Sequence, residues 1–218
     1  MTETPGRPTA SQSTPQGLRI LALGDSYTIG EGVAEGERWP ILLAERLRSH
    51  SFEVAPPRII AQTGWTTDEL ALAVEQARLD GFFDLVTLLV GVNNQYRGRS
   101  TAEYRVEFRG LVEQAIGFAE GHQERVIVLS IPDWGVTPYA EGRDRLRIAR
   151  EIDEFNCINR AEADTLGAVY VDVTQVSRLA ASQPCLLALD GLHPSAQMYA
   201  LWADLALRAA LTALGLIS

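Results

Sequence analysis

The sequence predicts an α/β protein in which helices cover both faces of a parallel β-sheet. Two features of the pattern predict this class. Short runs rich in Val, Ile and Leu recur along the chain, and longer amphipathic stretches separate them. The short runs are nearly continuous in hydrophobicity, as strands that are buried on both faces should be. Because helices join parallel strands in right-handed βαβ units, the repeated alternation indicates a parallel sheet covered on both sides.

Five strands and five long helices are expected after residue 17. We expect the strands at residues 19–23, 57–61, 85–90, 125–131 and 168–173. We expect the helices at residues 39–49, 67–79, 101–120, 143–166 and 196–214. The second helix illustrates the pattern, because Thr67 precedes Leu70 and Val74 at the spacing of a capped, partly buried helix.

The composition is that of one globular domain behind a short polar tail. The chain has 218 residues, of which 46% are hydrophobic and 22% are charged. It is therefore long enough to bury a sizeable core, and it is unlike a disordered or disulfide-scaffold protein. Residues 1–17 are rich in Thr, Pro, Ser, Gln and Gly and contain no apolar run, so we expect them to be disordered. A single domain is then expected over residues 18–218.

The charged residues exclude several classes of function. The formal net charge is −9, and all 19 basic residues are Arg. The lack of Lys eliminates reactions that need one, such as Schiff-base chemistry and phosphate binding by a P-loop. The acidic balance argues against binding to nucleic acid or to an anionic membrane, and no stretch approaches the roughly 18 apolar residues of a membrane span. We therefore expect a cytoplasmic protein with neither of these partners.

The two cysteines, Cys157 and Cys185, are too few for a disulfide framework. They also form no Cys-x-x-Cys pair, which would point to a redox or metal site. We expect two buried free thiols.

Most of the chemically reactive side chains follow the expected strands. In open parallel sheets, ligands bind at the carboxyl ends of the strands, so these loops are the candidate site. They are Gly24-Asp25-Ser26, Gln62-Thr63-Gly64, Gly91-Val92-Asn93-Asn94, Pro132-Asp133-Trp134 and, before the last helix, Asp190-Gly191-Leu192-His193-Pro194.

Ser26 and His193 are the candidates for nucleophilic catalysis at this edge. Of the three histidines, His50 at a helix end and His122 in a turn are explained as surface residues. His193 lies three residues after Asp190, a spacing that on a tight turn lets the carboxylate accept from Nδ1–H and leaves the other nitrogen as a base. A serine hydroxyl is a poor nucleophile until an imidazole takes its proton, so Ser26 would need His193. Turn chemistry at His193 and helix capping by Ser26 are the alternatives.

Acyl transfer also needs hydrogen-bond donors aimed at the developing oxyanion. The candidates are the N–H of Ser26, the N–H of Gly64 and the side-chain amide of Asn93. Gly64 lacks a Cβ, which lets its backbone approach a ligand closely. A turn glycine and an Asn that bonds its own loop would account equally for Gly64 and Asn93. The Gly-x-Ser-x-Gly elbow of α/β-hydrolases is missing, so a serine hydrolase here must have another fold.

Four blocks together resemble the SGNH (GDSL) hydrolase superfamily. The blocks are Gly24-Asp25-Ser26-Tyr27-Thr28-Ile29-Gly30-Glu31-Gly32, Gly64, Gly91-Val92-Asn93-Asn94 and Asp190-Gly191-Leu192-His193-Pro194, and they stand in the family's order across residues 24–194. The resemblance implies a three-layer α/β/α sandwich with a five-stranded parallel sheet, of the SGNH-hydrolase or flavodoxin-like type. It also implies an esterase or lipase-like activity that needs no metal and no cofactor.

The resemblance implies a role for each matching residue. Ser26 would be the nucleophile and also an oxyanion-hole donor, and Gly64 and Asn93 would complete the oxyanion hole. His193 would be the general base, and Asp190 would orient it.

Two residues depart from the family pattern. Tyr27 stands where the motif has Leu, which is a mild variation in this family. Asn94 stands where an Asp usually follows the Asn of the third block. The second departure bears on how the loop of Asn93 is braced.

Three other functions fit parts of the pattern less well. A dinucleotide site would need its third glycine at position 35, which is Glu35. A metallohydrolase could use Gly24-Asp25 and Asn93-Asn94, but the chain offers few histidines and no metal-ligand spacing. A catalytically inactive module that binds esters or glycans stays open, although competent residue types fill the triad and oxyanion positions.

Residues around the strand ends bear on the substrate. Those that could wall a pocket for a sugar or a short acyl group are Trp65, Asn94, Tyr96, Trp134 and Tyr139. Packing is the alternative for the aromatic ones. Arg97 and Arg99 flank the third loop, where a solvated loop is favoured over contact with an anionic group. No long apolar segment resembles a lid for lipid, so we expect a small soluble or short-acyl ester, including O-acetylated carbohydrate. A lipase, thioesterase or acyltransferase on the same site is the alternative.

Overall fold

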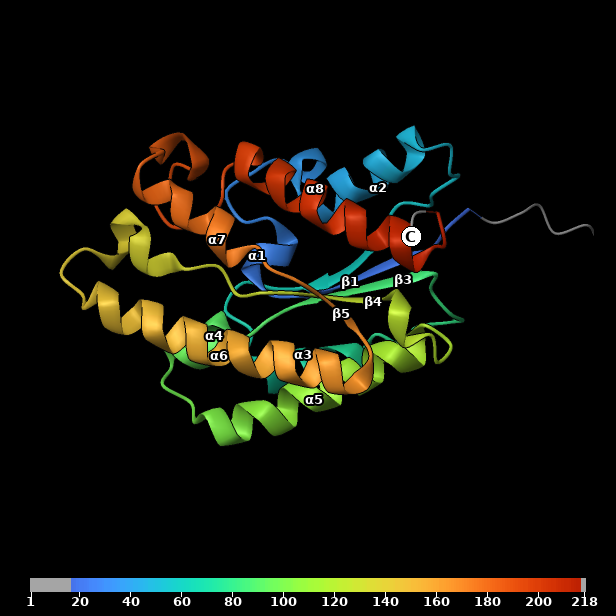
Figure 1. Cartoon of the computed structure of the whole chain (residues 1–218), viewed down its shortest axis with the longest axis horizontal. Coiled ribbons are helices and arrows are strands. Elements are labelled where there is room, and N and C mark those ends of the chain that lie inside the picture. The colour runs from blue at the N-terminus through green and yellow to red at the C-terminus, as the bar shows by residue number, and fades with distance from the viewer. Residues whose placement is uncertain (1–16, 217–218) are drawn as a thin grey trace, which may run out of the picture.

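A five-stranded parallel sheet forms the middle layer of the fold (Figure 1). The computed structural model describes residues 17–216. The strands are β1 (Ile20–Gly24), β2 (Arg58–Ala61), β3 (Leu85–Leu89), β4 (Val126–Leu129) and β5 (Val169–Val171). Their order in the sheet is β2-β1-β3-β4-β5, and every neighbouring pair is parallel. The predicted α/β class with five parallel strands is confirmed.

Helices cover both faces of the sheet and complete the three layers (Figure 1). One face is covered by α2 (Trp39–Ser49) and α8 (Ala196–Ala213), which lie against each other. The other face is covered by α3 (Thr67–Gln76), α5 (Thr101–Phe118) and α6 (Arg145–Leu166). The short helices α1 (Ser26–Ile29), α4 (Val92–Tyr96) and α7 (Thr174–Ser177) follow β1, β3 and β5. In the part of the chain that the structure describes, no helix is both long enough and apolar enough to cross a membrane.

The sheet brings the candidate functional loops to the same edge, at the carboxyl ends of its strands. The strands β1, β3 and β4 are buried at every position, whereas β2 and β5 at the two edges are partly exposed. A strand with helices on both faces buries every side chain, which explains the continuous hydrophobicity of the central runs. Gly24 at the end of β1 pairs with Ala61 and with Leu89. The residues that follow β1, β2 and β3 therefore emerge side by side.

Side-chain caps determine where several covering helices begin. Ser100, Asp144 and Ser195 precede α5, α6 and α8, and each accepts a hydrogen bond from the third N–H of its helix. These bonds satisfy N–H groups that have no acceptor within the helix. The helix expected from residue 143 thus begins at Arg145, because Asp144 is its cap.

The other differences from the expected elements concern ends and short segments. The helix expected to reach residue 79 ends at Gln76, because Arg78 adopts a left-handed backbone with a φ of 42°. The helices α1, α4 and α7 are not among the expected elements, since four or five residues are too few to show a helical period. Short 3-10 helices are likewise unforeseen, at Glu35–Glu37, Gln123–Arg125, Trp134–Val136, Pro138–Ala140, Arg178–Ala181 and Pro184–Leu186. The expected disordered tail lies, apart from Gly17, outside the described residues.

The prediction of two buried thiols is wrong, because Cys157 and Cys185 are both exposed. Cys157 lies on the outer side of α6, whose inner side carries the buried Ile152 and Phe155. Cys185 lies in a 3-10 turn in which the next residue, Leu186, takes the buried position. The prediction followed the residue type, whereas the orientation of each segment decides the exposure.

Candidate active site

The loops at the carboxyl edge of the sheet meet around a cavity of about 130 Å³. Residues from all five predicted loops reach it. Its lining consists of Ser26, Tyr27, Thr63, Gly64, Val92, Asn93, Tyr96, Trp134, Tyr139, Leu192 and His193. The structure thus brings together Ser26, Gly64, Asn93 and His193, four residues that the sequence proposes for catalysis. Among the described residues, Trp65 and Asn94 lie outside this lining.

Ser26 begins α1 directly after β1. A Cβ at Gly24 would overlap the carbonyl oxygen of Leu89, so only glycine fits at the end of this strand. Asp25 caps α1, because its Oδ1 accepts a hydrogen bond of 3.0 Å from the N–H of Tyr27. The short turn that follows leaves Ser26 5% exposed at the border of the cavity.

A hydrogen bond of 2.6 Å joins Nδ1 of His193 to Oδ2 of Asp190. The other carboxylate oxygen of Asp190 accepts from the backbone N–H groups of Leu192 at 2.9 Å and His193 at 3.0 Å. Partial burial opposes ionisation of Asp190. The hydrogen bonds from the His193 side chain and from the two N–H groups outweigh that effect and lower the pKa of the Asp190 carboxyl below its ordinary value. An ionised Asp190 favours the tautomer with its hydrogen on Nδ1, which leaves Nε2 of His193 available as a base.

Gly64 and Asn93 bring candidate oxyanion donors to the same cavity. Gly64 has a φ of 88°, a left-handed conformation that glycine adopts without strain. Its carbonyl oxygen accepts a hydrogen bond of 2.7 Å from Arg97. Nδ2 of Asn93 donates to the carbonyl oxygen of Trp65 at 2.9 Å, and the second hydrogen of this amide remains for an acceptor in the cavity. The loops that carry the two donors are therefore tied to each other, and the solvent-exposed Arg97 is part of that tie.

Three aromatic side chains form one wall of the cavity. The ring centroid of Trp134 lies 5.6 Å from that of Tyr96 and 6.0 Å from that of Tyr139. Trp134 is 4% exposed, and its indole N–H donates to Gln95 Oε1 at 2.9 Å. Tyr96 and Tyr139 are each 45% exposed. The wall is therefore fixed at its base and open to solvent at its rim.

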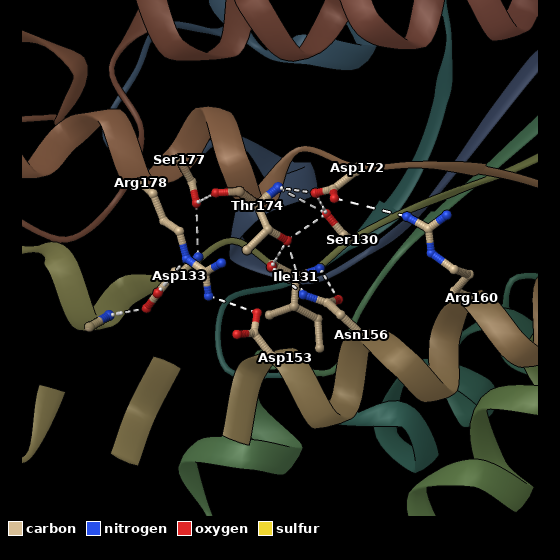
Figure 2. A network of polar contacts seen from close by, with 11 residues as sticks. Ser130, Ile131, Asp133, Asp153, Asn156, Arg160, Asp172, Thr174, Ser177 and Arg178 are labelled. Atoms are coloured by element: carbon tan, nitrogen blue, oxygen red, sulfur yellow. Dashed lines mark hydrogen bonds and ion pairs between the residues drawn. The ribbon is translucent and has the colours of Figure 1, made fainter. Parts of the chain in front are cut away.

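A polar network holds the loop that carries Trp134 (Figure 2). Asn156 on α6 binds both backbone groups of Ile131, accepting from its N–H at 2.7 Å and donating to its carbonyl at 2.9 Å. The buried Asp133 forms an ion pair of 2.9 Å with Arg178, which follows α7. Figure 2 shows these side chains converging on the loop from α6 and from the segment after β5. This network gives Trp134 a defined position.

The family of the chain follows from comparison with known proteins. The model of the GDSL-like lipase/acylhydrolase family matches residues 22–201. The chain belongs to this family. A comparison with curated protein sequences finds no match.

Solved structures share the fold of this GDSL-family chain at low identity. A lipase/acylhydrolase from Enterococcus faecalis is 22% identical, with a TM-score of 0.66 over 88% of this chain and 94% of that one. The acetylxylan esterase Axe2 from Geobacillus stearothermophilus is 19% identical, with a TM-score of 0.65 over 91% and 94% of the two chains. The psychrotrophic esterase EstA from Pseudoalteromonas sp. is 18% identical, with a TM-score of 0.65 over 90% and 98%. The three-layer fold predicted from the resemblance is thereby confirmed.

Asn94, the second departure of this chain from the GDSL-family pattern, braces the third loop. Its side chain is wholly buried. Its Oδ1 accepts from the N–H of Thr67 at 3.1 Å, and its Nδ2 donates to the Thr67 hydroxyl at 2.6 Å. These bonds fasten the loop of Asn93 to the start of α3. The structure therefore places Asn94 in a brace rather than in the pocket wall expected from the sequence.

Tyr27, the first departure, packs against the imidazole of His193. Its ring centroid lies 5.6 Å from that of His193 and 6.0 Å from that of Trp202. Burial raises the pKa of Tyr27, and the neighbouring carboxylates, Asp25 first, raise it further, so the phenol stays neutral. In this GDSL-family chain the residue after the serine thus packs beneath His193.

Asp25 is a buried acid whose state the sequence does not reveal. Burial raises the pKa of its carboxyl to about 7, although the hydrogen bond from the Tyr27 N–H opposes the shift. Its Oδ2 has no hydrogen-bond partner among residues 17–216. The sequence places Asp25 in the first motif and among the candidate metal ligands, but no local pattern indicates that its carboxyl is buried.

Two of the candidate metal ligands, Asp25 and Asn94, accept hydrogen bonds from backbone N–H groups. Oδ1 of Asp25 accepts from Tyr27, and Oδ1 of Asn94 accepts from Thr67. Over the described residues, no group of three or more His, Cys, Asp and Glu side chains is placed to hold a metal ion.

Proposed function

We propose that this chain hydrolyses carboxylic esters through an acyl-enzyme on Ser26. The observation that supports this most is the Asp190–His193 hydrogen bond of 2.6 Å, because His193 borders the cavity that Ser26, Gly64 and Asn93 also line. A serine nucleophile needs a base, an acid that orients the base, and oxyanion donors. Membership of the GDSL-like lipase/acylhydrolase family supports an esterase or acylhydrolase activity.

In the acylation step, Oγ of Ser26 attacks the ester carbonyl while Nε2 of His193 takes the hydroxyl proton. The carboxylate of Asp190 stabilises the imidazolium that forms. The oxyanion accepts hydrogen bonds from the N–H groups of Ser26 and Gly64 and from the amide of Asn93, each of which contributes roughly 10²–10³ in rate. When the tetrahedral intermediate collapses, the carbon–oxygen bond to the alcohol breaks and His193 returns the proton to the leaving oxygen.

Deacylation repeats these steps with water as the nucleophile. Nε2 of His193 takes a proton from water, the resulting hydroxide attacks the acyl carbonyl, and the same donors receive the oxyanion. Ser26 leaves with the proton from His193, and the carboxylic acid departs. An alcohol in place of water would give acyl transfer with the same residues, which is the alternative function of this site.

The size of the cavity favours a short acyl group. About 130 Å³ is available beside Ser26, and Tyr27, Leu192 and Trp134 bound it. An acetyl or similar group fits within these walls, whereas a long chain would extend across the open rim. The acetylxylan esterase Axe2 shares the fold, which supports O-acetylated carbohydrate as one candidate among small esters.

The test is hydrolysis of p-nitrophenyl acetate, butyrate and octanoate in the presence of EDTA. The wild type is compared with Ser26→Ala and, as a matched control, with Ser182→Ala, since Ser182 is exposed outside the cavity lining. We expect wild-type activity that EDTA does not reduce and that falls as the acyl chain lengthens. Ser26→Ala should lower this activity by at least about 10³-fold, and Ser182→Ala should leave it unchanged.

Three results would contradict the proposal. Activity that survives in Ser26→Ala would show that another group carries the reaction. Loss of activity with EDTA would point to a metal-dependent hydrolase. A folded wild type that is inactive on every ester would favour an acyltransferase with a specific donor or a module that only binds esters.

A further inference from the structure

A wider hollow of about 510 Å³ adjoins the cavity of Ser26. The two share Tyr96 and Trp134, so the aromatic wall of the small cavity is also a wall of the large one. For an ester whose acyl group occupies the cavity of Ser26, the large hollow is the adjoining space with room for the alcohol part. The large hollow is therefore the space that the alcohol part would enter.

The hollow contains three arginines, and two of them are neutralised. Arg99 lies 3.0 Å from Asp68, and Arg147 lies 2.6 Å from Glu151. Arg143 forms no ion pair with any residue that the structure describes. The neighbouring Asp144 uses Oδ1 to cap α6. Arg143 is thus the one arginine of this hollow without an ion pair among the described residues, and the remaining carboxylates of the lining, those of Asp144 and Glu154, form no ion pair with it.

Aromatic rings hold Arg143 in place. Its guanidinium carbon lies 5.1 Å from the ring centroid of Tyr96, 5.3 Å from that of Trp134 and 5.4 Å from that of Tyr139. One nitrogen donates to the Tyr96 hydroxyl at 3.1 Å, and that hydroxyl lies 3.3 Å from the hydroxyl of Tyr139. A guanidinium has five N–H donors, so most remain for a ligand. Stacking on rings fixes the side chain before binding, which lowers the entropic cost of capturing an anion.

We infer that Arg143 binds a carboxylate or similar anionic group on the alcohol part of the substrate. This inference rests on the proposed ester hydrolysis at Ser26. The planar fork of an arginine pairs with the two oxygens of such a group, and the rings beneath it offer a surface for the rest of the alcohol. The preferred substrates are then short-acyl esters of hydroxy acids or of acidic sugars rather than of neutral alcohols.

The test compares 4-acetoxybenzoate with its neutral methyl ester, which has the same shape around the reacting bond. For each variant the ratio of kcat/KM on the charged ester to kcat/KM on the neutral one is measured, because the comparison between variants cancels the different leaving groups. We expect Arg143→Gln to lower this ratio about tenfold, mainly through KM, and Arg143→Lys to lower it less. Arg147→Gln is the matched control, since Arg147 lines the same hollow but is paired, and it should leave the ratio within about twofold.

The assignment is overturned if Arg143→Gln leaves the ratio unchanged, or if Arg147→Gln lowers it equally. A larger effect of Arg143→Gln on monophenyl succinate, whose charge is in the acyl part, would overturn the placement of the anion on the alcohol side. Failure of the wild type to hydrolyse either ester would count against the esterase and not against Arg143. In that case calorimetric binding of 4-acetamidobenzoate decides, and equal affinity of the wild type and Arg143→Gln would overturn the anion site.

Discussion

The difference in unfolding free energy between Asp25→Asn and the wild type should shift in favour of the variant as the pH rises. Asp25 is fully buried, and burial raises the pKa of its carboxyl from 3.8 to about 7. The folded protein therefore holds a proton at pH values where the unfolded chain has released it. The raised pKa therefore lowers the free energy of unfolding of the wild type. This destabilisation is absent well below pH 4, grows between about pH 4 and pH 7, and is constant above pH 7.

The size of the effect follows from the two pKa values. The difference between 3.8 and about 7 corresponds to about 4 kcal/mol of unfolding free energy above pH 7. Between pH 5 and pH 8 the wild type should lose about 3 kcal/mol relative to Asp25→Asn. Asn keeps the oxygen that accepts from the Tyr27 N–H. Its buried amide nitrogen brings a cost that does not depend on pH, so the change with pH is the diagnostic quantity.

The assay is urea unfolding followed by Trp fluorescence at pH 5 and pH 8. The control is Asp68→Asn. Hydrogen bonds from Thr66 and Arg99 outweigh the partial burial of Asp68 and lower its pKa, so this carboxyl is ionised in both states across the range. Its Asn variant should differ from the wild type by the same amount at both pH values. If the difference between wild type and Asp25→Asn is also constant, Asp25 is ionised in the fold and the reasoning is refuted.

The remaining predictions concern the site. Asp190→Asn should lower kcat by about 10⁴ while the protein stays folded, because the carboxylate holds the tautomer of His193; a loss of activity that only follows unfolding of the variant would make Asp190 structural. Because the pKa of Asp190 is lowered in the fold, its contribution to stability is present above pH 4 and is lost as the pH falls through the lowered value, so acid unfolding of Asp190→Asn should be less steep than that of the wild type. Asn93→Ala should lower kcat by roughly 10²–10³, and a normal kcat would remove its amide from the oxyanion hole. Arg97→Ala breaks the bond to the Gly64 carbonyl and should lower kcat more than it raises KM, by about tenfold; an effect on KM alone would assign Arg97 to binding instead.

The long helices and strands could be predicted because the burial of their side chains gives a recognisable pattern of apolar residues in the sequence. The buried strands β1, β3 and β4 are continuous apolar runs, and the helices around them alternate at the helical period. The location of the candidate site followed from the same pattern, since parallel strands end at one edge. The short helices α1 and α4, on which Ser26 and Asn93 stand, gave no such pattern, because a single turn has no period to detect.

By itself, the sequence determined the fold class, the order of the strands and long helices along the chain, and the four loops that resemble a hydrolase family. Those properties depend on residue type and on spacing along the chain. Only the tertiary structure decided that Asn94 braces α3, that Cys157 and Cys185 are exposed, and that Arg97 and Arg99 have carboxylate partners while Arg143 lies over three rings. The physical reason is the same in each case. Burial and ion pairing depend on side chains that are distant in sequence, such as the Arg97–Glu69 and Arg99–Asp68 pairs, and no local pattern records which of them will meet.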